Sequence, residues 1–383
     1  MVRPSAEGLN FVDLVRALAR HAGAVGLPDG AGVRNIAENL GSAERLLLIL
    51  VDGLGMSQLG HLPSTGFLRS HLADRLQAVF PSTTAAALTT QATGQWPCDH
   101  ALTGWWLYLE SHDLTAVSLP FEERFSEQPL DRFGVSAGEL YPLPSFWTSL
   151  NHRVLSILPE DVAESTYSIY ARAGTPCRGY KDLAEALSLV LKTLAANDAP
   201  DFTYLYLPHV DSLCHDHGAA HEKVKQFLFI LDDALGEMAS NMPKAVRTII
   251  TADHGLVDIP GERRVILSDT DPLRSALRCL PTGEAAVPIF HVRAGHEKGF
   301  KDAFRSRFGE MFALLTPDEV ETLRLLGPGP LSPVTKKRLG TFVGIAPQPA
   351  VFLVRPPGAE PSKMKGYHGG LSRQEMEIPL IIV

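Results

Sequence analysis

Short apolar runs alternate with helical patterns along the 383-residue chain, and this alternation constrains the fold more than any other feature. Several runs are apolar along their whole length, which fits strands that are buried on both faces of a sheet. Apolar residues recur at helical spacing over residues 182–196 and 221–240. The sequence therefore predicts an α/β fold with a central, mostly parallel sheet sandwiched by helices. The runs expected to form its strands are 46–51, 154–158, 202–207, 247–251, 350–354 and 379–383.

Residues 259–364 interrupt this alternation and are rich in proline and glycine. Ligands of open α/β sheets bind beyond the carboxyl ends of the strands, so an insertion that leaves from such an end is placed to cover the site. We therefore expect a core made of residues 1–258 and 365–383, with an inserted cap subdomain at 259–364. The last part of the cap, including residues 350–354, could return to the core sheet.

Composition bounds the classes of function. The net charge of −8 and the isoelectric point near 6.0 provide no basic field, which disfavours a nucleic-acid polymer as partner and leaves small anionic substrates if metals supply positive charge. The run at 46–51 is too short to span a bilayer and residues 1–43 lack a signal-peptide core, so we expect no membrane partner and a cytoplasmic location. The oligomeric state stays unknown.

The cysteines give no sign of a disulfide framework or of a Cys-type zinc site, because their spacing is not paired. We expect reduced thiols at all four positions, which are Cys98, Cys177, Cys214 and Cys279.

Acids and imidazoles follow three of the expected strands. Asp52 comes directly after the run at 46–51, and the pair Asp253-His254 comes after the run at 247–251. Asp211 and His215 follow the run at 202–207 and would share one face of a helix. Such side chains suit a divalent metal. Each motif also has a simpler interpretation: a turn at Asp253-His254-Gly255, a helix cap at Asp52, and a solvent-facing, His-rich loop after the run at 202–207. If that loop binds a metal, His217 and His221 are alternative ligands.

Two further segments complete the set. The run Phe80-Pro81-Ser82-Thr83-Thr84 leads into an Ala-rich stretch that we expect to be helical through Thr93, with Gly94 as its end. Thr84 would lie near the helix N-terminus, where free N–H groups and the macrodipole favour an anion. Ser82 or Thr83 could equally serve as the N-cap. His368 lies among glycines before the last strand, and a lone histidine is weak support for a site.

Six ligand-type side chains are too many for one zinc ion, which takes three or four protein ligands. Two metals that share one cleft are the economical arrangement, and acids mixed with imidazoles suit Zn²⁺ while tolerating Mn²⁺ or Fe²⁺. The six are Asp52, Asp211, His215, Asp253, His254 and His368.

In their order along the chain, these motifs resemble the alkaline phosphatase superfamily and, within it, the type I phosphodiesterase/nucleotide pyrophosphatase branch. The resemblance covers residues 46–383 and implies an alkaline phosphatase-like fold. It implies that Thr84 is the nucleophile, with Thr83 as runner-up, and that Ala87 replaces an Asn which many members use to bind the phosphoryl oxygen. It also implies that Asp211, His215 and His368 bind one metal, and that Asp52, Asp253 and His254 bind the other.

The resemblance implies a two-metal-dependent hydrolase of phosphodiester or pyrophosphate bonds that takes a small phosphorylated substrate and forms a phospho-threonine intermediate on Thr84. Coordination to a metal lowers the pKa of a hydroxyl and makes it a usable nucleophile. Alternatives on the same site are a phosphomonoesterase, a phosphonate hydrolase or a phosphomutase. A non-catalytic metal-binding protein of the same fold is the alternative from another class.

Two sets of side chains bear on the substrate. A monoester dianion generally needs an extra cation, for which Arg124, Arg172 and Arg373 are available. The aromatic run at residues 105–108 could stack a substrate group or pack in the core.

Overall fold

A seven-stranded sheet forms the centre of the computed structural model, which describes residues 1–150, 152–354 and 363–383. The strand order is β2-β18-β9-β1-β8-β6-β7, and β9, β1, β8, β6 and β7 run parallel to one another. Strand β18 is antiparallel to both of its neighbours. The mostly parallel sheet predicted from the sequence is thus confirmed. Its strands are β2 (Leu72–Gln77), β18 (Glu377–Ile382), β9 (Val246–Thr251), β1 (Arg45–Val51), β8 (Phe202–Leu207), β6 (Val154–Pro159) and β7 (Cys177–Tyr180).

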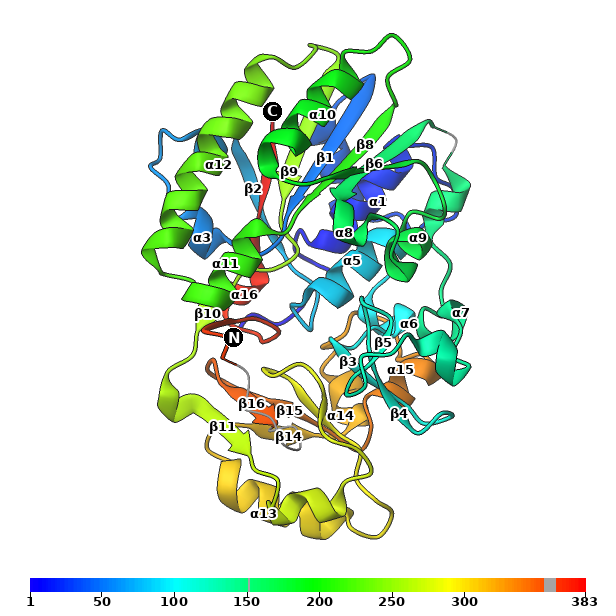
Figure 1. Cartoon of the computed structure of the whole chain (residues 1–383), viewed down its shortest axis with the longest axis vertical. Helices are drawn as coiled ribbons and strands as arrows, with labels where there is room; N and C mark the ends of the chain where they lie inside the picture. The colour runs from blue at the N-terminus through cyan, green and yellow to red at the C-terminus, as the bar shows by residue number, and fades with distance from the viewer. Residues whose placement is uncertain (151, 355–362) are drawn as a thin grey trace.

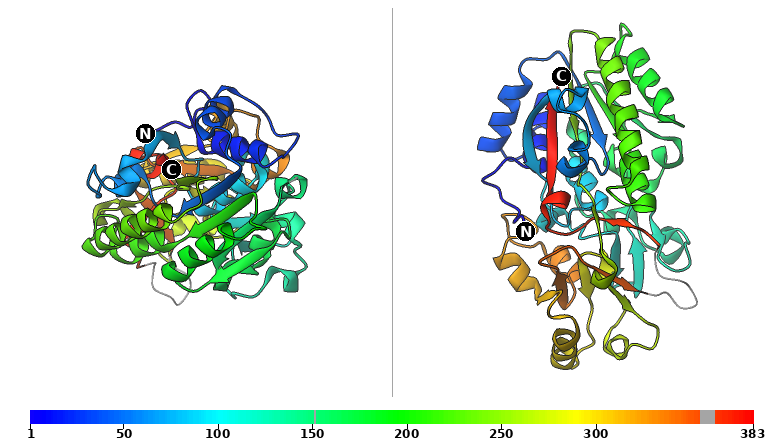
Figure 2. Two further views of the ribbon diagram at one scale, coloured as in Figure 1. Left: turned by 90° about the horizontal axis from the view of Figure 1, so that it is seen from above. Right: turned by 90° about the vertical axis from the view of Figure 1, so that its left-hand side faces the viewer.

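Helices cover both faces of this sheet. Figure 2 shows α1 (Phe11–His21) and α2 (Ala31–Leu40) on one side of the sheet, and α10 (Leu183–Leu194) and α12 (Glu222–Ser240) on the other. The latter two confirm the helices predicted from apolar spacing. Because both faces are covered, the middle strands exclude water, and residues 46–51 of β1 are all buried.

The helix predicted from the Ala-rich stretch is α5 (Thr84–Thr93), and it ends as expected at Gly94. The φ of Gly94 is 65°, a left-handed conformation that glycine adopts without the strain that a Cβ would add. The helix lies against α1 and starts at the end of the sheet where the parallel strands finish (Figure 1).

A second seven-stranded sheet lies below the first in Figure 1. Its strands pair antiparallel, and they come from two separate stretches of the chain, 106–123 and 282–345. Residues 106–123, which precede the predicted cap, therefore share a sheet with it. The order is β14 (Ala313–Leu315), β15 (Phe342–Ile345), β13 (Pro288–Phe290), β12 (Thr282–Gly283), β3 (Trp106–Leu109), β4 (Leu114–Val117) and β5 (Glu122–Glu123).

The expectation that residues 350–354 belong to the central sheet is wrong. They form β16 (Val351–Val354), which pairs in parallel with β11 (Arg264–Leu267) in a separate two-stranded sheet. The cause is a separate apolar cluster in this part of the molecule, where Phe352 packs against the rings of Phe290 and Phe304. An apolar run predicts a buried strand, but it does not specify which core buries it. Residues 355–362 of the predicted cap lie outside the described residues.

Within the described part of the chain, no helix has the length and apolar character needed to cross a bilayer.

Candidate functional site

Three adjacent parallel strands, β9, β1 and β8, end at the same edge of the central sheet. Each is followed by predicted ligand residues, so the topology brings together side chains that lie up to about two hundred positions apart in the sequence. The backbone N–H of Asp211 donates to the carbonyl oxygen of Asp52 across 3.0 Å. Gly53 allows this approach, because a Cβ built on it would lie 2.9 Å from the Asp211 backbone.

The first triplet, Asp52, Asp253 and His254, is buried, and its candidate ligand atoms all lie within 4.8 Å of one another. Nε2 of His254 is 3.5 Å from Oδ1 of Asp52 and 3.4 Å from Oδ2 of Asp253. The backbone N–H groups of Gly53 and His254 both donate to Oδ1 of Asp253. These bonds fix the Asp253 carboxylate and leave its Oδ2 facing the other two side chains.

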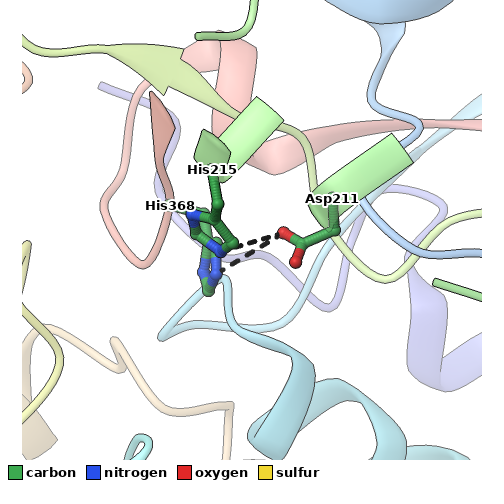
Figure 3. A group of neighbouring side chains, drawn as sticks. All are labelled: Asp211, His215 and His368. Atoms are coloured by element: carbon green, nitrogen blue, oxygen red, sulfur yellow. Dashed lines mark ion pairs between the residues drawn. The ribbon is translucent and has the colours of Figure 1, made fainter. Parts of the chain in front are cut away.

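The second triplet, Asp211, His215 and His368, is shown in Figure 3, where the carboxylate points at both imidazoles. Oδ1 of Asp211 is 3.2 Å from Nε2 of His215 and 3.8 Å from Nε2 of His368. The Nδ1 atoms of the two rings face backbone carbonyl oxygens, those of Gly366 and Ser82, at 2.9 and 3.1 Å. Such contacts hold the rings with Nε2 toward the carboxylate, as in known metal sites.

Asp211 and His215 lie one turn apart on α11 (His209–His217), which follows β8. His368 reaches them because β17 (Gly366–Tyr367) pairs with β10 (Val257–Asp258), a short strand just after His254. The rings of His254 and His368 stack with centroids 3.9 Å apart, so the two triplets are contiguous. The alternative ligands His217 and His221 stack on each other instead, outside both triplets.

The two candidate nucleophiles face different partners. The hydroxyl Oγ1 of Thr84 is 3.1 Å from Nε2 of His254 and 3.4 Å from Oδ2 of Asp52. Oγ1 of Thr83 instead donates to Oε1 of Glu284 across 2.6 Å. Thr84 begins α5, so its hydroxyl lies at the N-terminal end of that helix, where the macrodipole favours negative charge.

Two carboxylate oxygens test whether this cluster fits metal ions. Oδ1 of Asp52 and Oδ2 of Asp253 are buried and have no hydrogen-bond partner among the described residues. An unpaired buried carboxylate oxygen is costly unless a cation or a donor faces it. Burial raises the pKa of Asp52 well above its usual value, and the neighbouring charges of Asp253 and Asp211 raise it further. The donor set therefore fits two divalent cations, one at each triplet.

Tyr206, on β8, is a residue that no sequence motif singled out. Its hydroxyl donates to Oδ2 of Asp52 and so orients this carboxylate, and the hydroxyl of Tyr180 donates in turn to the carbonyl oxygen of Tyr206. Partners of this kind outside the ligand set support metal affinity. Nothing in the sequence distinguishes Tyr206, because it is one of several aromatic residues in a strand that is predicted to be buried in the core.

Glu284 is the second residue that the sequence did not indicate. It lies between β12 and β13, and its Oε1 accepts hydrogen bonds from the Thr83 hydroxyl and the Trp105 N–H, both at 2.6 Å. A Cβ built on Gly369 would lie 3.1 Å from the Cβ of Glu284, so Glu284 touches the His368 loop as well. One side chain thus contacts three loops of the site. Burial raises its pKa to about 7, although the two hydrogen bonds oppose the shift.

Replacing Glu284 by glutamine is expected to make the metal-free protein less sensitive to pH. The folded pKa of about 7 exceeds the usual 4.5, so the wild-type carboxyl contributes stability below pH 4.5 and loses that contribution as the pH rises through 7. Glutamine keeps the acceptor oxygen without the charge. We expect the variant to gain about 2 kcal/mol in free energy of unfolding relative to wild type between pH 5 and pH 8. Urea unfolding of both proteins at the two pH values measures this gain. A difference in free energy of unfolding between variant and wild type that is the same at both pH values would contradict the prediction.

A cavity of about 540 Å³ opens beside Asp52, Thr84 and Asp211. The face of α5 that lines it carries Thr84, Leu88 and Gln91. Ala87 lies on the adjoining face, fully buried in the main apolar core, so the absence of an Asn at position 87 leaves no gap in the cavity wall.

The three arginines proposed as phosphate partners have other contacts. Arg124 lies over the ring of Trp106, 4.0 Å from its centroid, and donates to the carbonyl oxygen of Pro281. Arg373 is largely exposed and pairs with Glu377. Arg172 lines the cavity, where both oxygens of Glu164 accept from it at 3.0 Å. No arginine or lysine of the described residues approaches Thr84 as a free cation in the cavity lining.

Solved structures with the same fold come from animals and a bacterium. Human ectonucleotide pyrophosphatase/phosphodiesterase 5 has a TM-score of 0.68 at 15% identity, and the alignment covers 88% of this chain and 87% of that one. The mouse protein, as an inactive threonine-to-alanine variant in complex with AMP, has a TM-score of 0.65 at 14% identity, with the same coverage. Phosphonoacetate hydrolase from Sinorhizobium meliloti 1021, in complex with phosphonoformate, has a TM-score of 0.63 at 16% identity and covers 89% and 90%.

Comparison with curated protein sequences finds no relative. A family comparison matches residues 46–370, a span that starts in β1 and ends just after His368. This span contains both triplets, Thr84 and the cavity. The chain therefore belongs to the type I phosphodiesterase/nucleotide pyrophosphatase family of hydrolytic enzymes.

Proposed function

We propose that the protein is a two-metal-dependent hydrolase of phosphodiester or pyrophosphate bonds that acts through a covalent intermediate on Thr84. The observation that carries this proposal is the position of one hydroxyl: Oγ1 of Thr84 is 3.1 Å from His254 and faces the carboxylate of Asp52, at the border of two carboxylate–imidazole triplets. Asp52, Asp253 and His254 would hold one divalent cation, and Asp211, His215 and His368 the other. Zinc suits this donor set, and Mn²⁺ or Fe²⁺ also fit.

The side chains of this chain account for both steps of the reaction. When bound, two divalent cations supply positive charge that lowers the pKa of a hydroxyl and neutralises the phosphoryl oxygens. Thr84 loses its proton to water and its oxygen attacks phosphorus; the Thr–O–P bond forms as the bond to the first alcohol breaks, and that alcohol leaves as an anion that takes up a proton from water. Water then attacks the same phosphorus and gives up a proton, the Thr–O–P bond breaks, the threonine oxygen is protonated again and the monoester is released. The N-terminus of α5 favours the anion that develops at Thr84 in both steps.

Two of the structural neighbours support these roles. The mouse ectonucleotide pyrophosphatase/phosphodiesterase is inactive as a threonine-to-alanine variant and binds AMP, which accords with a threonine nucleophile and a small phosphorylated ligand. The bacterial phosphonoacetate hydrolase binds phosphonoformate, which keeps phosphonate hydrolysis as the alternative on the same site. We also propose that residues 259–364 act as the cap over this site, and that the protein, whose four cysteines are free thiols, works in the reducing cytoplasm.

The charges around Thr84 favour diesters over monoesters. A monoester dianion carries one more negative charge than a diester, and Arg172, the arginine that lines the cavity among the described residues, is paired with Glu164. We expect kcat/KM of the zinc-loaded enzyme to be at least about 10-fold higher for bis-p-nitrophenyl phosphate than for p-nitrophenyl phosphate, because a missing charge partner costs more than 1 kcal/mol. A higher rate on the monoester would favour the phosphomonoesterase alternative. The release of phosphate from phosphonoacetate by the same enzyme preparation tests the phosphonate hydrolase alternative.

A further inference from the structure

A short hairpin of the predicted insertion carries Glu284 into the site. Strand β12 pairs antiparallel with β13, and the backbones of Glu284 and Val287 exchange two hydrogen bonds of 3.1 Å, so the turn between the strands is tight. Gly283, directly before Glu284, also pairs with Trp106 of β3. A Cβ built on Gly104 would lie 2.5 Å from the Gly283 backbone, so these two backbones are in close contact. Backbone pairing therefore places Glu284 before its side chain makes any contact.

The side chain of Glu284 reaches the residue that precedes the proposed nucleophile. Thr83 occupies the N-cap position of α5, where a threonine hydroxyl ordinarily accepts a hydrogen bond from an N–H group of the first turn. The Thr83 side chain makes no such bond, and its Oγ1 donates to Oε1 of Glu284 instead. Both residues are buried. Glu284 therefore anchors the residue directly before Thr84, at the point where α5 begins.

The same carboxylate oxygen holds a second part of the site. Oε1 of Glu284 also accepts the backbone N–H of Trp105, and the carbonyl oxygen of Trp105 accepts from the N–H of Ser118 at 2.8 Å. Trp105 lines the cavity beside Thr84. A buried donor that loses its partner is costly, so the two donors and this oxygen hold one another in place. One buried acceptor thus joins the start of α5 to the cavity wall.

We propose that Glu284 is a positioning residue for the reaction, which holds the start of α5 so that the Thr84 hydroxyl keeps its place beside Asp52 and the cavity. The inference rests on the proposed function, in which Thr84 attacks phosphorus. A displacement of about 1 Å can cost about 100-fold in rate, because the reacting atoms must be close and aligned. Both donors to Glu284 are neutral, so its hold depends on the reach of the side chain and an acceptor oxygen, and not on its charge.

Two conservative substitutions separate reach from charge. Glu284→Gln keeps the length and an acceptor oxygen and removes the charge, whereas Glu284→Asp keeps the charge and is one methylene shorter. We expect kcat of the zinc-loaded enzyme for bis-p-nitrophenyl phosphate to fall at least about 10-fold in Glu284→Asp and to stay within about 3-fold of wild type in Glu284→Gln. KM should change less than about 3-fold in both, since the loss is one of orientation. Glu310→Asp, at an exposed position of the predicted insertion, is the matched control and should change neither constant.

Hydrogen exchange of the zinc-loaded protein without substrate measures the hold of Glu284 independently of activity. The N–H of Ala87 donates to the carbonyl oxygen of Thr83 at 3.0 Å and reports the start of α5. The N–H groups of Ala87 and Trp105 should exchange at least about 10-fold faster in Glu284→Asp than in wild type or Glu284→Gln, while α12 exchanges alike in all three. Thr83→Val removes one of the two donors and should speed exchange at Ala87 alone.

The results that would overturn the inference are distinct from those that would overturn the proposed function. Wild-type kcat in Glu284→Asp would contradict the inference, as would equal losses in Glu284→Asp and Glu284→Gln. A lower kcat with wild-type exchange at Ala87 and Trp105 would also contradict it. A wild-type protein that hydrolyses no ester would overturn the proposed function, and the exchange of the two N–H groups would then still decide whether Glu284 holds the start of α5.

Discussion

Replacing Thr84 by alanine is expected to lower kcat for bis-p-nitrophenyl phosphate at least about 10³-fold, because the variant loses the oxygen that attacks phosphorus. The loss should appear in kcat with little change in the amount of bound metal, since Thr84 contacts His254 and Asp52 without being one of the six proposed ligands. The fold should survive, because the Thr84 side chain does not cap α5.

Two variants control this experiment. Thr84→Ser keeps a hydroxyl at the same place and should retain activity to within about 10-fold of wild type. Thr83→Val removes the neighbouring hydroxyl, which bonds to Glu284, and should cost less than about 10-fold, because it disturbs the loop without removing the nucleophile. Full activity of Thr84→Ala, together with loss of activity in Thr83→Val, would make Thr83 the nucleophile.

Removing metal is expected to lower hydrolysis to the uncatalysed background, and adding zinc should restore it. The same treatment should change stability. Burial and the charges of Asp253 and Asp211 raise the pKa of Asp52 above 3.8 in the folded metal-free protein, so that protein loses stability as the pH rises above 3.8. Bound cations remove this cost. Calorimetric unfolding at about pH 7.5 should therefore show a higher Tm with zinc than without it.

Asp52→Asn separates the two consequences of this charge cluster. It should abolish zinc-dependent hydrolysis and, in the metal-free protein, raise the free energy of unfolding by about 1–3 kcal/mol through removal of one buried charge. Asp74→Asn, at an exposed position in β2, is the matched control and should change neither property. A metal-free Asp52→Asn protein that is less stable than wild type would contradict the view that the cluster is strained without cations.

The middle of the fold could be predicted from the sequence because its strands are apolar on both faces. Strands β1, β8 and β9 lie within one residue of the predicted runs. The edge strands β2 and β7 were missed, since both carry polar, exposed residues and resemble loops. The pairing of β16 with β11 could not be predicted, because a short apolar run carries no information about its partner.

Some residues of the site could likewise be predicted from the sequence, and others could not. Asp253 and His254 follow a buried strand, and the order of strands in a parallel sheet brings such residues together at one edge. The grouping into two triplets, which the resemblance implied, is the grouping that the structure has, although their metal-binding role is still a proposal. Glu284 and Tyr206 have no such signal: one is an isolated acid in the predicted insertion, and the other is an aromatic residue among core residues. Their importance depends on contacts over long sequence separations.

The most direct test of the central claim is to trap the covalent intermediate on Thr84. Zinc-loaded enzyme is mixed with excess bis-p-nitrophenyl phosphate, quenched in acid within one turnover, digested and analysed by mass spectrometry. We expect a p-nitrophenyl phosphoryl group on Thr84 of the wild type, formed with a burst of one p-nitrophenolate per active site, and no such group in Thr84→Ala. An active enzyme that releases product without a burst, or that carries the group on another residue, would contradict it.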